Sequence, residues 1–459
     1  MKEMKKNMTQ GTENKLYEGS VFTKLILFAL PFLASNIVQS FYSVADILIV
    51  GNFSGPESMS GVNIGGQVTL VLTKIVIGLC MGATVLIGQY LGAGNRELLK
   101  KVTSTIITLL LAIGLGITVI MLAARGPILR MVQTPAESYA ESESYLTVTV
   151  LGLVFIFGYN ALGGIMRGMG DSKRPFYFVM VACITNVALD LLFVAVFKWR
   201  AFGAALATIM SQALSMFLCI WYMRRNNFQF DFRLSSFKVD RAQLKLILKL
   251  GLPTSVQNGI TSMSFLFITA IINIVGGVSA SAAVGAVSKV NNFAFMPAMA
   301  LSAAISAMAA QSIGAGNISR AVRACQIGTV ISVAVTYVFF VLLQIYPGAA
   351  VSLFGDDPRM IADGIAYLHS FSYDFLFIPF NFCINALFIA GGHARFTLIN
   401  SMLSSVLLRV PICYIFSITL GWGMWGAGLA APAASAGVML VILGFLFSGK
   451  WKQNAAIQQ

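Results

Sequence analysis

The sequence predicts an all-α, polytopic membrane protein of twelve transmembrane helices in two pseudo-symmetric lobes of six helices each. Of its 459 residues, 57% are apolar and only 10% are charged, and the mean hydropathy is +0.81. Soluble domains carry about 25% charged residues. The chain contains a dozen long apolar runs, each sufficient to cross a bilayer, and its second half repeats the first. These three observations define the fold class.

The apolar runs are separated by short polar segments. We expect the spans at 21–50, 61–91, 98–123, 138–167, 176–197, 203–223, 246–275, 281–312, 321–346, 361–390, 396–419 and 424–448. The predicted domains are an N-terminal segment (1–20), a first lobe (21–223), a linker (224–245), a second lobe (246–448) and a tail (449–459).

The distribution of basic residues predicts the orientation. With the N-terminus inside, the inner segments carry twenty-one Lys and Arg residues and the outer segments carry five. This is the positive-inside bias, so both termini are expected in the cytoplasm and the spans in the cell (inner) membrane. No cleavable signal peptide is evident. The net charge of +14 is scattered over loops, which argues against nucleic acid as a partner.

The sequence gives no indication of a metal site, a disulfide, an ATP-binding domain or an enzyme. The six cysteines lie in apolar spans at unrelated spacings, so we interpret them as small hydrophobic residues and expect no disulfide or metal site. No phosphate-binding loop of the GxxxxGK[ST] type occurs, and no soluble domain is long enough to bind ATP. We expect no enzyme activity and no cofactor.

The halves are related by internal duplication. Shifting the residue numbering by 222 places Pro31 on Pro253, Asn36 on Asn258 and the segment 89–95 on 311–317; a shift of 223 places 203–207 on 426–430. Six spans are an even number, so both lobes insert with the same orientation around a pseudo-two-fold axis along the membrane normal. The repeated Gly-Ala-Gly-Asn at 92–95 and 314–317 is typical of helix ends, where glycine adopts the left-handed conformation.

The first span keeps a polar stripe. Asn36, Gln39, Ser43 and Asp46 recur at steps of 3, 4 and 3, which places them on one helical face. A charge in contact with lipid at membrane depth costs about 2.5–3.5 kcal/mol on insertion scales. The stripe should therefore line a wet cavity or a partner helix, and Asp46 favours a functional site over a polar seam between helices.

These features together resemble the multidrug and toxic compound extrusion (MATE) family. The resemblance rests on the Asp46-containing span, the Gln-x-x-Gly-Ala-Gly-Asn ends, the sequence Arg-Gly-Met-Gly-Asp-Ser-Lys-Arg-Pro at 167–175, and the Asn and Asp at 186 and 190. It covers residues 20 to 450. It implies two six-helix lobes and export of small organic, often cationic, compounds in exchange for protons or sodium ions.

The resemblance also implies a coupling site in the first lobe, at Asp46, Tyr145, Asn186, Asp190 and Thr208. The residue pattern agrees, because Asn186 and Asp190 share a helical face and Thr208 begins a polar face on the next helix. Two nearby carboxylates in low dielectric should share a proton or a cation. Protonation alone would suffice, although Na⁺ could bind at Asp46, Asn186, Asp190 and Thr208. The alternative is a hydrogen-bonded network that carries no ion.

The second lobe lacks this carboxylate pattern. At the 222 shift Asp46 falls on Ile268, and the tenth span offers Asp374. The intramembrane cations Lys74, Lys289 and Arg409 have no assigned role.

Polar positions on apolar spans are candidates for the substrate cavity, and these are Asn36, Gln39, Asn160 and Asn258. A lipid-linked oligosaccharide flippase or lipid flippase of the same exporter superfamily is the main alternative function, and a passive channel is another. The expected partners are small organic substrates and the lipid bilayer, with the chain acting as a monomer.

Overall fold

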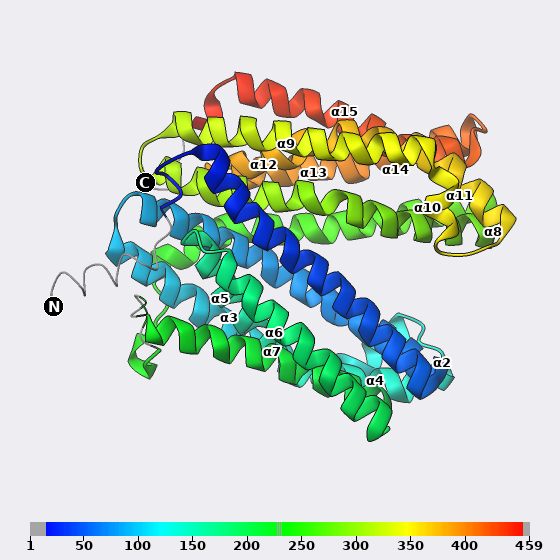
Figure 1. The fold of residues 1–459 in the computed structure, drawn as a ribbon, viewed down its shortest axis with the longest axis horizontal. Coiled ribbons are helices and arrows are strands. Elements are labelled where there is room, and N and C mark those ends of the chain that lie inside the picture. The colour runs from blue at the N-terminus through cyan, green and yellow to red at the C-terminus, as the bar shows by residue number, and fades with distance from the viewer. Residues whose placement is uncertain (1–14, 227, 229, 231, 453–459) are drawn as a thin grey trace. The chain divides into compact units, whose positions relative to one another are not determined.

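The chain is helical in the computed structural model, which describes residues 15–226, 228, 230 and 232–452. No strand occurs among these residues, which confirms the all-α class. The first half forms α2 (Val21–Gly92), α3 (Arg96–Met131), α4 (Ala136–Leu151), α5 (Leu153–Gly168), α6 (Lys173–Asp190), η1 (Leu191–Val196) and α7 (Arg200–Arg225), as Figure 1 shows. After a short turn, η2 (Leu234–Ser236), the second half forms α8 (Arg241–Gly314), α9 (Ile318–Ile345), α10 (Pro347–Ser352), α11 (Pro358–Phe371), η3 (Ser372–Leu376), α12 (Ile378–Ala390), α13 (Ala394–Met402), η4 (Leu403–Leu408), α14 (Arg409–Tyr414), η5 (Ile415–Thr419), α15 (Gly423–Phe447) and η6 (Lys450–Lys452).

The two longest helices, α2 and α8, each comprise two membrane spans. At 1.5 Å per residue, a helix of 72 residues would be about 108 Å long, against a hydrocarbon core of about 30 Å. Each is interrupted by one glycine with non-helical backbone, Gly55 (φ 81°, ψ 176°) in α2 and Gly277 (φ 63°, ψ −144°) in α8. A side chain disfavours positive φ, so glycine is the residue that makes this reversal possible.

The span count agrees with the expected twelve. Among the described residues, eight helices are individually long and apolar enough to cross a membrane. Two bent pairs also qualify: α4 with α5, bent by 50°, and 358–376 with α12, bent by 42°. Dividing α2 and α8 at their glycines then gives twelve spans.

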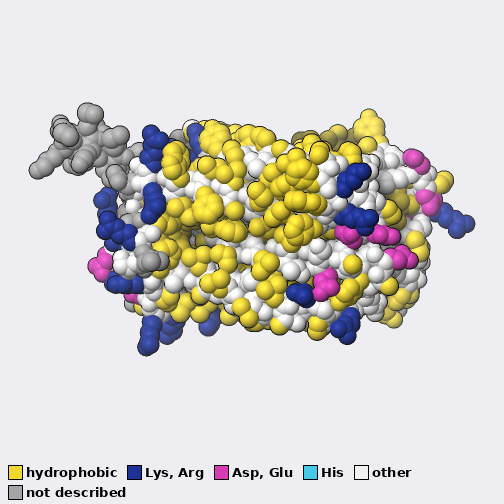
Figure 2. Space-filling view, turned by 90° about the horizontal axis from the view of Figure 1, so that it is seen from below, with side chains coloured by type: hydrophobic (Ala, Val, Ile, Leu, Met, Phe, Trp, Pro, Cys, Tyr) yellow, Lys and Arg dark blue, Asp and Glu magenta, His cyan; other side chains and the backbone are white. Residues whose placement is uncertain are grey.

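The surface chemistry suits a membrane. On the face in Figure 2, apolar side chains form a broad band, Lys and Arg are densest at one end of the helices, and Asp and Glu lie mainly towards the other. Large exposed apolar side chains, such as Leu115, Val119 and Ile120 on α3, point outwards at 60–69% exposure. Such exposure is stable where lipid, rather than water, surrounds the helix.

The internal duplication extends to the backbone. Glycines with positive φ recur at the 222 shift, in the pairs Gly55 and Gly277, Gly94 and Gly316, and Gly170 and Gly392. The repeated Asn95 and Asn317 each cap the following helix, accepting a 3.0 Å hydrogen bond from a backbone N–H three residues ahead. The interpretation of Gly-Ala-Gly-Asn as a helix end is thereby confirmed.

Three π-helical segments, η1, η4 and η5, interrupt the regular α-helical turns of the membrane spans. In η1 and η5 the last N–H bonds the carbonyl five residues back, from Phe197 to Leu192 and from Leu420 to Ile415, both at 2.9 Å. These two segments correspond at the 223 shift, whereas η4 has no counterpart in α6. A π turn holds one residue more than an α turn. The extra residue of η4 therefore accounts for the change of shift from 222 to 223.

Contacts divide the described chain into two units. The first contains Leu30–Ser255, and the second contains Leu16–Ala29 with 256–452. The first turns of α2 thus belong with the second unit and the first turns of α8 with the first. Both changes fall within three residues of a helix-interior proline, Pro31 or Pro253. The lobes predicted at 21–223 and 246–448 remain a sequence-based division.

Hydrogen bonds between the side chains of Arg320 and Gln311 and the backbone anchor the segment before α2 inside the second unit. The Arg320 guanidinium donates to the carbonyl oxygens of Leu16, Glu18 and Gly19 at 2.7–3.2 Å. Gln311 Oε1 accepts from the Leu16 N–H at 2.8 Å. Leu16 itself is buried. This segment, 16–19, is therefore a fixed part of the second unit.

Candidate functional site

The first unit encloses a cavity of about 450 Å³. Both halves of α2 contribute to its wall, together with α4, α5, α6 and α7, which pack against one another in Figure 1. The polar residues around it include Gln39, Tyr42, Ser43, Asp46, Asn63, Gln67, Thr69, Thr73, Tyr145, Thr149, Tyr159, Asn160, Asn186, Thr208, Ser211 and Gln212.

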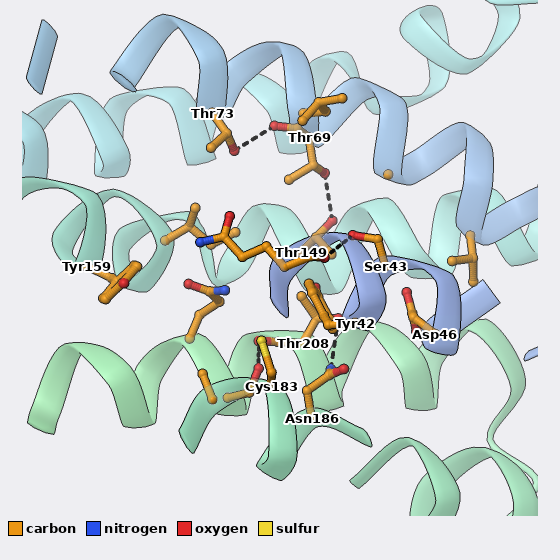
Figure 3. A pocket seen from close by; sticks show the side chains of 18 of the residues that line it. Tyr42, Ser43, Asp46, Thr69, Thr73, Thr149, Tyr159, Cys183, Asn186 and Thr208 are labelled. Atoms are coloured by element: carbon orange, nitrogen blue, oxygen red, sulfur yellow. Dashed lines mark hydrogen bonds between the residues drawn. The ribbon is translucent and has the colours of Figure 1, made fainter. Parts of the chain in front are cut away.

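Asp46 is the last residue of the polar stripe on α2 and is 6% exposed. Its position follows from the 3-4-3 spacing, which keeps the stripe on one side while leucine, isoleucine and valine cover the others. One carboxylate oxygen, Oδ1, is buried and has no hydrogen-bond partner among the described residues. Figure 3 shows the side chain beside Ser43 and across from Asn186.

The carboxyl group of Asp190 lies within hydrogen-bonding reach of Asp46. Asp190 is the last residue of α6, is fully buried and directly precedes the π segment η1. Two carboxylates in contact in a low dielectric repel strongly, and a hydrogen bond between them requires a proton. The pair can therefore be stable only with a shared proton or a bound cation.

Asn186 connects this pair to α7. Its amide is 1% exposed, and the surrounding hydrogen-bond pattern places the nitrogen 3.0 Å from Asp190 Oδ2 and the oxygen 3.2 Å from the backbone nitrogen of Thr208. In the opposite orientation the amide nitrogen would face Thr208 Oγ1 at 3.4 Å. Either way, Asn186 joins the end of α6 to the start of α7.

Two tyrosines complete the cluster. The side chains of Tyr42 and Tyr145 line the cavity together with Thr208, and both phenols interact electrostatically with the two aspartates. A Cβ built on Gly65 would stand 2.6 Å from the Tyr145 ring, so glycine is required there for α4 to approach α2. The cluster is thus held by close packing as well as by hydrogen bonds.

A line of threonines follows the second half of α2. Thr73 donates to the Thr69 carbonyl at 2.9 Å, and the Thr69 hydroxyl lies 3.3 Å from that of Thr149 on α4, as the dashed lines in Figure 3 show. Each of these three hydroxyls bonds the carbonyl four residues before it. The hydroxyl oxygens of these three threonines line the cavity and can act there as weak hydrogen-bond acceptors.

The structure brings the five predicted coupling residues together. Asp46, Tyr145, Asn186 and Thr208 line the cavity, and Asp190 contacts Asp46. Of the predicted substrate residues, Gln39 and Asn160 line it as well. Asn36 lies on the same unit but not among the lining residues, and Asn258 belongs to α8 in the second unit.

The sequence did not lead us to predict Tyr42, Thr69, Thr73 or Thr149 as cavity residues. Tyr42 is four residues before Asp46, which is the spacing that places two side chains on one helical face, so this signal was available. Thr69 and Thr73 show the same spacing. Single threonines are common inside helices because the hydroxyl can bond its own backbone, so they gave no distinct signal.

The described residues contain no group of three or more His, Cys, Asp or Glu side chains that could hold a metal ion, and all six thiols are free. The oxygens around Asp46 and Asp190 are two carboxyl groups, an amide, a hydroxyl and phenols. Such a donor set suits a proton or a monovalent cation, because only two ionisable acids contribute charge.

Comparison with known proteins identifies related chains. The MatE family model matches twice, at residues 31–192 and 253–415, which together make up more than half of the chain. The two matches are offset by 222 at their starts and by 223 at their ends, as the internal duplication is.

Two relatives match this chain over nearly its whole length. "Probable multidrug resistance protein YoeA" of Bacillus subtilis (strain 168) is 30% identical over 442 residues, covering 95% of each chain. "Probable multidrug resistance protein YpnP" of the same organism is 27% identical over 449 residues, covering 95% of this chain and 97% of the relative. A crystal structure described as "MATE in the bent conformation" superposes with a TM-score of 0.90 at 22% identity, covering 98% of this chain and 99% of that one.

Proposed function

Because this chain is a member of the MatE family, a family of membrane transporters, we propose that it exports small organic, often cationic, compounds by antiport with protons. Relatives named as multidrug resistance proteins support export of varied compounds. The observation that carries the coupling proposal is the contact of Asp190 with Asp46, which lines the cavity. Sodium ions are the alternative coupling ion.

The contact explains why ion and substrate would compete. With both aspartates ionised, the cavity carries two negative charges and favours a cationic compound. A proton that enters from outside neutralises part of this charge, and the affinity for the cation falls. Coupling of this kind requires only that each ligand favours a different state of the same site.

The helices that carry Asp46 and Asp190 contain irregularities that would allow two conformations. Pro31 and Pro56 lie inside α2 and remove backbone hydrogen bonds on either side of Asp46. The Ser35 hydroxyl donates to the Pro31 carbonyl at 2.9 Å, one turn back along the same helix. The π segment η1 directly follows Asp190. We propose that protonation lets the first half of α2 bend and repack against α6.

The wall of the cavity supports a cationic, partly aromatic substrate. The rings of Tyr42, Tyr145 and Tyr159 line it, and aromatic rings attract organic cations. Gln39 and Asn160 add amides that can orient a ligand. No Lys or Arg belongs to the cavity lining among the described residues. This argues against the flippase alternative, because a diphosphate headgroup would require basic side chains.

The test is export of a fluorescent organic cation from loaded proteoliposomes that contain the purified chain. We expect export against the dye gradient when a pH gradient is imposed, with or without sodium, and collapse of export when a protonophore is added. Export that follows a sodium gradient at constant pH, without response to the pH gradient, would replace protons by sodium. A flippase would leave the dye in place, and a channel would only equilibrate it.

A further inference from the structure

A groove of about 420 Å³ opens on the exposed side of α7, close to the C-terminal end of that helix. The residues that line it are Phe217, Ile220, Trp221, Arg224 and Arg225. They follow one another at steps of 3, 1, 3 and 1, which places all of them on one helical face. None of them lines the cavity of the candidate functional site, so this groove is a separate feature of the first unit.

The apolar part of the groove faces away from the protein. Phe217 and Trp221 are each 55% exposed, whereas Met216, Cys219 and Met223, on the other side of the same turns, are buried. Large rings exposed in this way on a membrane span are stable because lipid surrounds them. The natural neighbour of this face is therefore a lipid molecule.

The polar part of the groove carries two positive charges. Arg224 and Arg225 form the last turn of α7, and the Cζ atom of Arg225 lies 5.3 Å from the centroid of the Trp221 ring. No acidic residue occurs on α7, and neither arginine forms an ion pair with any residue that the structure describes. The positive-inside bias predicts that this end of the helix faces the cytoplasm. The groove thus combines exposed rings with two uncompensated guanidinium groups at the inner side of the membrane.

A phospholipid has the chemistry that both parts require. A guanidinium donates two parallel hydrogen bonds to phosphate oxygens, and a tryptophan ring is well suited to the boundary between headgroups and acyl chains. The eight residues from Phe217 to Arg225 span about 12 Å along the helix axis. One lipid can therefore contact the arginines with its phosphate and the rings with the upper part of an acyl chain. Basic residues at the cytoplasmic surface favour lipids whose headgroup carries net negative charge.

The duplicated helix end in the second half of the chain lacks this group of residues. At the 223 shift Arg224 falls on Phe447 and Arg225 on Ser448, while Gly444 replaces the tryptophan. The combination of a ring and two basic side chains is consequently not a general property of the helix end that the duplication repeats. It belongs to the first half alone.

We propose that the groove at the inner end of α7 binds an anionic phospholipid of the cytoplasmic leaflet. Arg224 and Arg225 hold the phosphate, Trp221 packs against the glycerol region, and Phe217 and Ile220 contact the acyl chain. The inference is independent of the proposed function, because lipid binding is measured without a transported compound or an ion gradient.

The experiment measures binding of dioleoyl phosphatidylglycerol and dioleoyl phosphatidylcholine to the purified full chain in detergent, by native mass spectrometry and by the rise in melting temperature. We expect saturable binding of phosphatidylglycerol with at least about tenfold preference over phosphatidylcholine. Arg224→Gln/Arg225→Gln should weaken phosphatidylglycerol binding by roughly tenfold to thirtyfold and leave phosphatidylcholine binding unchanged. Trp221→Leu, which keeps the charge, should weaken the binding of phosphatidylglycerol as well.

A matched control separates a specific site from the effect of net charge. Arg323→Gln/Arg395→Gln removes two exposed arginines that are expected on the same side of the membrane in the second half of the chain. Because the total charge changes equally, this variant should retain the affinity for phosphatidylglycerol. Glycerol 3-phosphate, which carries a phosphate without acyl chains, should not displace the lipid at equal concentration.

Three results would overturn the proposal. Equal affinity for the two lipids would show that the headgroup is not recognised, and equal losses in the two double variants would show a general charge effect. Displacement by glycerol 3-phosphate would assign the groove to a soluble phosphate compound instead of a lipid. If Arg224→Gln/Arg225→Gln does not fold, the two single variants provide the test: each should weaken phosphatidylglycerol binding by about fivefold, and unchanged affinity in both would equally reject the site.

Discussion

The side-chain amide of Asn186 lies between Asp190 and Thr208, 3.0 Å from the carboxylate of the first and 3.2 Å from the backbone nitrogen of the second. The amide therefore connects the end of α6 to the start of α7, and under the proposed mechanism a change of charge at Asp190 would reach α7 through it. A neutral residue with this geometry can transmit a proton-dependent change without titrating.

Replacing Asn186 with leucine should uncouple export from the ion gradient. The substitution keeps the branching of the side chain but leaves Asp190 without its amide donor, and a hydrogen bond to a charged group contributes about 1.5–3 kcal/mol. We expect gradient-driven dye export to fall by roughly tenfold to a hundredfold. Asn52→Leu is the matched control, because the Asn52 amide donates to its own helix, at the Leu48 carbonyl, and does not line the cavity. Equal losses in both variants would exclude a specific role for Asn186.

Asp46→Asn and Asp190→Asn should each abolish gradient-driven export while the chain remains folded. Neutralising a charge inside a membrane seldom destabilises a protein, and the amide retains the size of the carboxyl group. The double variant should be no worse than either single one, since in the proposed mechanism the two groups act as one proton-binding unit. Initial rates of export at equal reconstitution measure this. Additive partial losses would show two independent acids.

Arg320→Ala should release the segment 16–19. The guanidinium makes four hydrogen bonds to its carbonyl groups, and loss of such a set in a partly exposed site should lower the free energy of unfolding by about 1–3 kcal/mol. Hydrogen–deuterium exchange should increase at residues 16–20. Arg323→Ala, an exposed change on the same helix, is the control. Unchanged exchange at residues 16–20 in Arg320→Ala would show that other contacts hold the segment.

Glycine-to-alanine changes should have opposite signs at two sites. A Cβ on Gly82 would lie 2.7 Å from the Gly251 nitrogen and 2.8 Å from the Ile247 carbonyl oxygen, both backbone atoms. Gly82→Ala should therefore lower stability by about 1–3 kcal/mol. Gly116, inside α3, has no atom within 4 Å of such a Cβ, and Gly116→Ala should raise stability by about 0.5–1 kcal/mol. Melting temperatures of the two variants would test both signs.

Asp171, in the loop between α5 and α6, should make stability depend on pH. Burial raises the pKa of its carboxyl, and this outweighs the lowering by the hydrogen bonds and charge of Arg174. A folded-state pKa above the unfolded value means that the contribution to stability is full below the ordinary pKa and is lost as the pH rises through the raised one. Asp171→Asn should remove this part of the pH dependence of the melting temperature. An unchanged profile would assign it to other groups.

Composition and periodicity were sufficient for the fold class, the span order and the polar stripe of Asp46, whereas the residues grouped around Asp46 were predicted from the resemblance to the MATE family. The first three features depend on hydropathy and helical spacing, which are local properties of the sequence. The residues 51–60, expected as a loop between two spans, instead continue as helix on both sides of Gly55, because one positive φ reverses the backbone without a longer connection. Helix ends in a membrane protein are decided by such single residues.

The parts that could not be predicted depend on packing between helices. The π segments have no sequence signature, since an extra residue per turn is stabilised by tertiary contacts such as the bond from Ser264 to Ser405. The contact between Asp46 and Asp190 required the crossing of α2 and α6, which spacing within one helix does not define. Asn36 and Gln39 share a stripe, but of the two only Gln39 lines the cavity, because the cavity does not extend along α2 as far as Asn36.

The anchoring of residues 16–19 in the second unit has a consequence for biosynthesis. Leu16 leaves the ribosome early, whereas its partner Gln311 follows 295 residues later. At about 5–20 residues per second, that interval lasts roughly 15–60 s. During this time the start of α2 is inserted without the neighbours that it will finally contact. A chaperone, the insertion machinery or lipid must shield it, and ribosome pausing in the second half should prolong the exposure of a segment that was made in the first.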